Sequence, residues 1–579
     1  MISYLKTTLV LLFAVFFVFA CEDSYDSLVE DQLEQNPTPD QVSGDAGAAD
    51  FSNYVAIGNS LTAGYMDAAL YNLGQEYSLA ALIHQQMQFA GAPGNFNQPD
   101  INSERGFNTS VQQPQGGPVL GRFKLDTSIP GPSPTVGGDP IAPYDGNTSE
   151  LNNFGVPGIL LGQLLTPATG GPQSDPAFNP FYWRFASAPG SSTILGDAIA
   201  TQPSFFTLWI GNNDVLGYAI SGASNPNLLT SEQEFQDYFN NSDGQSGVIN
   251  QLMNNTTAEG VVATIPPVSA VPYFQAVSYN AVELGEQEAA QLNQGLAAVN
   301  AALQAVADNF PNRSQEDMDA RKVSYQEGAN PILVNDPVLP DLENEFDQLE
   351  QLGAISAQQR QQLVPYEQSR PLIAIDQDGD GEPEQKELVT LSAGAVLGTE
   401  FNPQSQTPTT IGAVIPLGYN SQEFAFGDAY YLTLQEQAEI QSRTTAFNTI
   451  IATAVAQNAD RLALFDINAG FPGNPNTQLG AFADLFGIDG ELGIRVQGTL
   501  LQPDFSPNGV FSTDGIHPNP RGNAILANEF IRVIEDAFGA SIPEVDVLNL
   551  PSVQLCAGDC VSQQQAKPIA ESSNITFDL

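Results

Sequence analysis

Four short runs of consecutive apolar residues recur along the chain, and each is followed by a turn rich in Gly, Asn, Pro or Asp. Strands buried on both faces of a parallel sheet read as continuous apolar runs, whereas half-buried strands alternate apolar and polar residues. The runs therefore predict buried parallel strands at residues 54–57, 205–210, 260–265 and 461–467.

Helical patterns lie between and after these runs. They cover residues 77–89, 289–310, 434–457 and 520–538. In the last of them the apolar side chains recur at the spacing that places them on one face of a helix. Strands that alternate with helices predict an α/β fold, here a three-layer α/β/α sandwich around a parallel sheet.

Residues 276–430 break this alternation, because they are too long for a single connection. They hold two helical patterns, a strand-like stretch at 330–334 and loops rich in Gly, Thr and Pro. We interpret them as an insertion or lid subdomain. The other segments are then the two parts of the main domain, 51–275 and 431–545, and a C-terminal tail, 546–579.

The N-terminus carries a processing pattern. Lys6 precedes an apolar run at 9–20, which is shorter than the ~20 residues that span a bilayer but suits a secretion signal. The run ends at Cys21 and resembles the lipobox of bacterial lipoproteins, although Phe19 is bulkier than the usual residue. The resemblance implies removal of residues 1–20, lipid attachment to Cys21 and an outer-membrane or cell-surface location. The alternative is a plain signal peptide with a chance Cys.

Residues 21–50 form an acidic, polar stretch without sustained periodicity, which predicts a tether. An acidic run after the lipidated Cys is similar to the surface-export signal of Bacteroidetes lipoproteins. The alternative is a solvated linker.

The charge balance excludes one large class of partners. The chain has 66 Asp and Glu residues against 17 Lys and Arg, a net charge of −49. A nucleic-acid binder needs Lys and Arg to neutralise phosphates, so nucleic acid is not expected as a partner. The chain has only two histidines, His84 and His517, so any catalytic histidine is one of these.

Four separated motifs carry the candidate chemistry. Ser60 follows the first predicted strand, between Gly58 and Gly64, at the edge where open α/β sheets bind ligands. By itself such a serine can equally be a helix N-cap. The other three motifs are Asn153-Phe154-Gly155-Val156-Pro157-Gly158, Trp209-Ile210-Gly211-Asn212-Asn213-Asp214 and Asp514-Gly515-Ile516-His517-Pro518-Asn519.

Together and in this order, these motifs resemble those of the SGNH (GDSL) hydrolase family. The Gly-Asp-Ser-Leu motif of that family is here Gly-Asn-Ser-Leu, with Asn59 in place of Asp. The resemblance covers the four motifs and leaves residues 276–430 unmatched. It implies a flavodoxin-like fold and oxyanion donors on Ser60, Gly158 and Asn213, with Gly155 as a competitor for Gly158.

The residue types suit hydrolysis by a serine nucleophile. A hydroxyl is a weak nucleophile at neutral pH, so Ser60 needs a base, and His517 can supply it. Asp514, three residues upstream, is close enough to bond the second ring nitrogen of His517 and orient it. His84 lies inside a predicted helix without an acidic neighbour, so we expect it to have a packing or surface role.

An acidic segment matches the spacing of a calcium-binding loop, D-x-D-x-D-G-x5-E. The candidate ligands are Asp376, Asp378, Asp380, Glu382 and Glu387. Such an ion would be structural, because the triad needs no metal and no cofactor. The alternative is an acidic surface turn.

Cys556 and Cys560 are separated by Ala-Gly-Asp, and in an exported protein they are expected to form a disulfide.

These observations predict a lipid-anchored extracytoplasmic serine esterase or lipase. Its substrate would be a carboxylic ester, whether an acyl lipid, a short ester or an acetylated glycan. The alternative is a non-catalytic surface lipoprotein that binds a glycan or another partner on the same scaffold.

Overall fold

The computed structural model describes residues 43–128, 131–379, 383–402, 409–419, 429–469 and 493–561. The signal peptide, Cys21 and most of the predicted tether lie outside these residues. No helix within the described part of the chain has both the length and the apolar character needed to cross a membrane.

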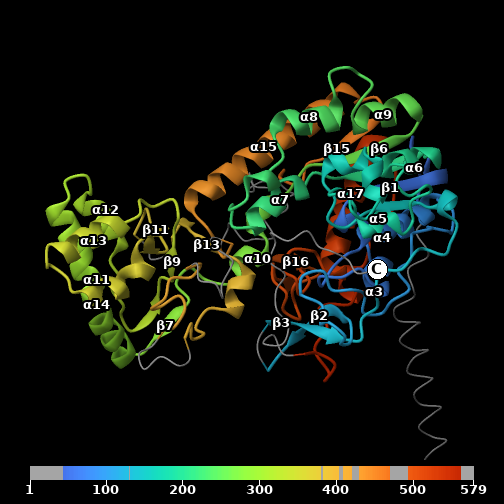
Figure 1. Cartoon of the computed structure of the whole chain (residues 1–579). Coiled ribbons are helices and arrows are strands. Elements are labelled where there is room, and N and C mark those ends of the chain that lie inside the picture. The colour runs from blue at the N-terminus through green and yellow to red at the C-terminus, as the bar shows by residue number, and fades with distance from the viewer. Residues whose placement is uncertain are drawn as a thin grey trace, which may run out of the picture.

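A five-stranded parallel sheet forms the centre of the larger body (Figure 1). Its strand order is β15 (Leu462–Phe465), β6 (Glu259–Ala263), β5 (Phe205–Trp209), β1 (Tyr54–Gly58) and β4 (Asn153–Gly155). The fold is therefore α/β with a parallel sheet, and the four predicted strands are confirmed to within a few residues.

The fifth strand, β4, was not predicted as a strand. It is only three residues long and contains Asn153 and Gly155, so it lacks the apolar run that marks the others. Its register comes from β1, where Ile57 pairs with Phe154.

Both faces of the sheet are covered. All five residues of β1 and of β5 are buried. On β5, Phe205 and Trp209 meet the aromatic rings of helix α17 (Pro520–Phe538). Because side chains alternate between the faces of a strand, Phe206 and Leu208 point to the opposite face, where they are fully buried.

The helices of this body include both of the longer ones that were predicted for it. Helices α15 and α17 were predicted at their observed bounds, whereas the pattern at 77–89 covers α4 and the first two residues of the 3₁₀ helix Gln88–Ala90. The helices are α2 (Ser60–Ala63), α3 (Asn72–Glu76), α4 (Leu79–Met87), α5 (Pro180–Trp183), α6 (Ile194–Ala200), α7 (Asn213–Ile220), α8 (Glu232–Asn240), α9 (Val248–Asn255), α10 (Pro272–Gln275), α15 (Leu434–Gln457) and α17.

The order of the strands reverses beside Ser60. From β1 the chain goes to β4 on one side of it and then to β5 on the other. Ligands of open α/β sheets bind outside the carboxyl ends of the strands at such a reversal of order. Ser60 follows β1, and Asn213 lies four residues after β5.

A second lobe lies at the far end of α15 (Figure 1). It has two hydrophobic clusters of its own, one around Phe346 and one around Val389. Its elements are β7 (Val282–Leu284), α11 (Glu286–Asn309), α12 (Gln315–Arg321), β8 (Gly328–Asn330), β9 (Leu333–Asn335), α13 (Glu343–Gln351), α14 (Ala357–Leu363), β10 (Ser369–Pro371), β11 (Ala374–Ile375), β12 (Gln385–Lys386), β13 (Leu388–Val389) and β14 (Tyr431–Leu432).

One strand predicted in this lobe is wrong as a single element. The stretch 330–334 contains the end of β8 and the start of β9, which pair with different strands. Pro331 separates them, and proline has no N–H to donate to a sheet.

Two hairpins complete the structure, β2 (Leu120–Asp126) with β3 (Gly131–Val136) and β16 (Ile494–Val496) with β17 (Thr499–Leu501). The C-terminal segment runs along the first hairpin, where Leu125 N–H donates to the Gln554 carbonyl and Val136 N–H to the Asp559 carbonyl.

Candidate active site

Ser60 is placed by the junction of β1 and α2. The Asn59 side chain caps α2, because its Oδ1 accepts the Leu61 N–H at 3.1 Å. Asn59 therefore supplies an oxygen acceptor at the start of α2. At Gly58 an added Cβ would lie 2.4 Å from the Trp209 carbonyl oxygen, so the close approach of β1 to β5 requires glycine here.

His517 is held by the loop that precedes α17. Its carbonyl accepts the Ser512 N–H at 2.7 Å, and two residues later Asn519 caps the helix by accepting the N–H groups of Arg521 and Gly522. The ring of Tyr65 packs edge-on against the imidazole, with 5.0 Å between the ring centroids. These contacts limit the orientations open to the imidazole.

The structure brings together Ser60, His517 and Asp514. The Ser60 Oγ lies 2.9 Å from His517 Nε2, and His517 Nδ1 lies 2.9 Å from Asp514 Oδ2. A serine hydroxyl, an imidazole and a carboxylate joined in this order are the three parts of a nucleophile, its general base and the group that orients the base.

The environment of Asp514 keeps it ionised. Burial alone would raise the pKa of this carboxyl, but the charge of His517 and hydrogen bonds from its ring and from two backbone N–H groups lower the pKa to about 2. Those N–H groups belong to Ile516 and His517. A carboxylate at neutral pH can accept a hydrogen bond from Nδ1–H, which leaves Nε2 unprotonated and facing Ser60 as the base.

Asp67 joins this arrangement, although no sequence motif marked it. Its Oδ1 accepts both the N–H and the hydroxyl of Thr513, the residue before Asp514. The neighbouring Ala68 N–H donates to Asp514 Oδ2 at 3.1 Å. The sequence separation between the two segments is over 440 residues, so only the tertiary structure could reveal this contact.

The candidate oxyanion donors lie on three segments. The side-chain amide of Asn213 carries two N–H groups. One of them donates to the Ile159 carbonyl at 2.8 Å, and the other can donate to a ligand. Gly158 is exposed with φ of 76°, whereas Gly155 is buried and its N–H already donates to the Asn153 side chain. This favours Gly158 over Gly155 as a donor to a ligand.

Asp214 fastens two of these segments together, a role that its motif alone did not reveal. Its carboxylate accepts the Leu161 N–H at 2.8 Å and the Thr230 hydroxyl at 2.8 Å. Burial raises the pKa of Asp214 to about 7, although both hydrogen bonds oppose the shift. The loop that carries Gly158 is thereby held against α7, which begins at Asn213.

A small cavity of about 50 Å³ opens beside Ser60. Asn213 and His517 also line it. The rest of its wall is mainly apolar and includes Leu61, Leu216, Val268, Val271, Phe511 and Leu526. A cavity of this size and lining suits a small apolar group attached to a carbon that Ser60 could attack.

His84 lies away from Ser60, as the packing or surface role predicted. It is 3% exposed and stacks with Phe96 at 5.0 Å and with Tyr54 at 6.3 Å between ring centroids. Burial lowers its pKa to about 4. It lines a separate, more open cavity of about 480 Å³ that Ser60 does not reach.

The acidic loop differs from the expected calcium ligand set. Asp376, Asp378 and Glu384 lie with carboxylate oxygens within 4.8 Å of one another, and Glu384 was not predicted. Asp380 and Glu382 lie outside the described residues. Three carboxylates in one place fit a hard cation such as Ca²⁺.

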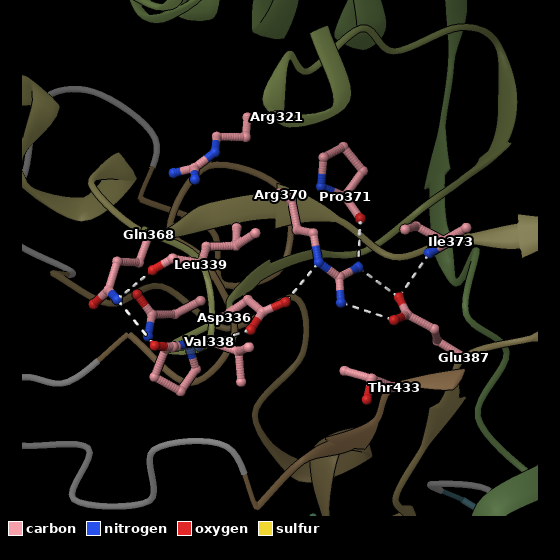
Figure 2. Close-up of polar contacts among 12 residues, drawn as sticks. Arg321, Asp336, Val338, Leu339, Gln368, Arg370, Pro371, Ile373, Glu387 and Thr433 are labelled. Carbon is pink, nitrogen blue, oxygen red and sulfur yellow. Dashed lines mark hydrogen bonds and ion pairs between the residues drawn. The ribbon is translucent and has the colours of Figure 1, made fainter. Parts of the chain in front are cut away.

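Glu387 does not join this group, which corrects its assignment as a ligand. Both of its oxygens bond the Arg370 guanidinium, at 2.6 and 2.7 Å (Figure 2). Arg370 also pairs with Asp336 at 2.7 Å, and all three side chains are buried. A buried arginine needs such partners, so Glu387 is committed to the core of the second lobe.

Cys556 and Cys560 form the predicted disulfide.

Comparison of the chain with models of protein families, with curated proteins and with solved structures yields no match.

Proposed function

We propose that the protein is a lipid-anchored, extracytoplasmic serine esterase of the SGNH type. The observation that carries this proposal is the Ser60–His517–Asp514 chain of hydrogen bonds, each 2.9 Å long, at the carboxyl end of β1. The anchor and the location rest on the N-terminal pattern that ends at Cys21.

In this proposal the reaction proceeds through an acyl-enzyme. Ser60 Oγ attacks the ester carbonyl carbon while His517 Nε2 takes the hydroxyl proton, and His517 then gives that proton to the departing alcohol. Water, deprotonated by His517, attacks the acyl-enzyme, and His517 returns that proton to Ser60 Oγ as the bond to the acyl carbon breaks and the acid leaves. The negative charge on the carbonyl oxygen is met by Ser60 N–H, Gly158 N–H and the Asn213 side chain, and each such donor contributes about 3 kcal/mol.

The size of the cavity beside Ser60 limits the length of the acyl group that can bind there. Its volume of about 50 Å³ is far below the roughly 300–1,000 Å³ of sites for drug-sized ligands. Short acyl groups therefore fit without movement of the surrounding side chains, whereas long chains require the cavity to open.

The experiment compares wild type with Ser60→Ala on nitrophenyl esters of increasing acyl length. We expect turnover of the short esters and a loss of at least about 10³-fold in kcat for Ser60→Ala, because the nucleophile is gone. Ser133→Ala is the matched control, since Ser133 is also a buried serine and its hydroxyl has no partner among the described residues. A wild-type protein without Ser60-dependent turnover on any ester would contradict the proposal and favour a binding role.

A further inference from the structure

We propose that Asp67 is a positioning residue that holds the Asp514–His517 loop in register with Ser60. This inference rests on the proposed function and deepens it. Asp67 touches none of the three triad side chains directly, and it acts through Thr513 and through its own neighbour Ala68.

The contacts of the 67–68 segment reach three consecutive residues of the loop. Asp67 N–H donates to Ser512 Oγ at 3.1 Å, and Asp67 Oδ1 accepts Thr513 N–H at 2.9 Å and Thr513 Oγ1–H at 2.6 Å. Ala68 N–H donates at 3.1 Å to Asp514 Oδ2, the same oxygen that bonds His517 Nδ1. The position of that oxygen therefore depends on this segment.

The backbone of the segment is held in a conformation that L residues rarely adopt. Asp67 has φ of 55° and Ala68 has φ of 60°. Such a conformation is unfavourable for an L residue and persists only where the surroundings impose it. The surroundings here include the Phe123 N–H, which donates to the Asp67 carbonyl at 2.8 Å, and the Thr109 N–H, which donates to the Ala68 carbonyl at 3.1 Å.

The charge of Asp67 is balanced on the side away from the loop. Its Oδ2 accepts the Tyr71 hydroxyl at 2.7 Å and lies 3.4 Å from an Arg122 nitrogen. The Arg122 guanidinium covers the Tyr71 ring at 4.3 Å. Asp67 and Arg122 are both less than 10% exposed, so the pair anchors the segment in the interior.

Loss of the Asp67 carboxylate frees Thr513 and lets Asp514 shift relative to His517. A displacement of about 1 Å in a catalytic constellation can cost about 10²-fold in rate. We therefore expect Asp67→Ala to lower kcat by about 10- to 100-fold with little change in KM, because no substrate contact is lost. Asp67→Asn keeps an oxygen for Thr513 and should recover most of this loss.

The control is a second buried aspartate that accepts from an arginine. Asp336 pairs with Arg370 in the second lobe and, like Asp67, is nearly inaccessible to solvent (Figure 2). Asp336→Ala should lower the melting temperature without the fall in kcat. Equal kcat in Asp67→Ala and Asp336→Ala would overturn the inference.

A second readout does not depend on turnover. The chain has only two histidines, so the imidazole NMR signals of His517 can be assigned by comparison with His84→Asn. We expect Asp67→Ala to shift the Nδ1–H signal of His517 and Asp336→Ala to leave it in place. An unshifted signal in Asp67→Ala would overturn the inference even if no ester is hydrolysed.

Two further outcomes are distinguishable. If Asp67→Ala does not fold, Thr513→Val removes only the hydroxyl that donates to Asp67, and it should shift the same signal with a smaller loss of kcat. If wild type hydrolyses no ester in a Ser60-dependent manner, the proposed function fails while the NMR comparison still decides the role of Asp67.

Discussion

At the scale of single residues, the candidate site shows how burial and hydrogen bonding give carboxyl groups different protonation states. Asp514 and Asp214 are both buried aspartates, with pKa values of about 2 and about 7. Burial raises the pKa of both carboxyls, but Asp514 faces His517 and two N–H groups of its own loop, which lower it. Asp214 is bonded by the Leu161 N–H and the Thr230 hydroxyl, which are neutral groups, so burial dominates its pKa.

The stability of Asp214→Asn relative to that of wild type should increase as the pH rises from acidic to neutral and alkaline values. The unfolded aspartate has a pKa near 3.8 and the folded one about 7. The unfolded state therefore loses its proton first, so the stability from Asp214 is full below about pH 4 and declines until about pH 7. Asparagine has no such decline, and the full difference is roughly 4 kcal/mol.

Thermal unfolding of both proteins between pH 4 and pH 8 measures this effect. The advantage of Asp214→Asn over wild type should grow as the pH rises. A difference between the two proteins that is constant across this range would contradict the raised pKa of Asp214.

At the scale of elements, the loop that precedes α17 determines the position of His517. Asn519 caps the helix, and its side-chain amide also donates to the carbonyls of Gly509 and Phe511. The side chain is 2% exposed, so both carbonyls would lose a partner in a dry environment if it were removed.

Asn519→Ala should lower the free energy of unfolding by about 2 kcal/mol or more, since a lost N-cap alone costs about 1 kcal/mol. It should also lower kcat, because the loop before the cap carries His517. Ser231→Ala removes the half-buried N-cap of α8 and serves as the control. Urea denaturation that places Asn519→Ala level with Ser231→Ala would contradict the expectation.

The acidic loop is an element whose ligand set depends on how two short strands, β11 and β12, pair across it. If Asp376, Asp378 and Glu384 bind Ca²⁺ structurally, EDTA should lower the melting temperature, since a ligand at a hundredfold excess over Kd stabilises by about 2.7 kcal/mol. Asp376→Asn should lose this sensitivity. Equal melting curves for wild type with EDTA and with added Ca²⁺ would contradict the site.

At the scale of the whole molecule, one parallel sheet presents the candidate site and one long helix, α15, leads from it to the second lobe (Figure 1). The main hydrophobic core includes residues from both ends of the described chain, such as Phe51 and Val547. The candidate site is likewise built from both ends of the described chain, because Ser60 lies near its start and His517 near its end.

Membrane attachment is a property of the whole chain that one residue tests. Cys21→Ser should move the protein from the membrane fraction to the soluble fraction, since lipid attachment needs the thiol. Ser60→Ala, expressed in the same way, should stay with the membranes. Cys21→Ser protein that still fractionates with membranes would contradict the anchor.

Local patterns determined much of the fold. The strands β1, β5, β6 and β15 are readable because burial on both faces of a sheet leaves a continuous apolar run. Helix α17 is readable because burial of one helix face leaves a helical period of apolar residues. The residue types needed for a nucleophile and a base were also readable, since two histidines left few choices.

Only the tertiary structure decided the contacts between distant segments. It paired the three-residue β4 with β1, placed Asp67 against Thr513, and paired Glu387 with Arg370 and not with the candidate metal ligands. These contacts depend on strand register and on which side chains lie next to a buried charge. Both are set by segments that are far apart in the sequence, and local sequence patterns do not show which distant segments meet. The sequence by itself therefore determined which residues could do chemistry, and the packing of the chain decided which of them meet.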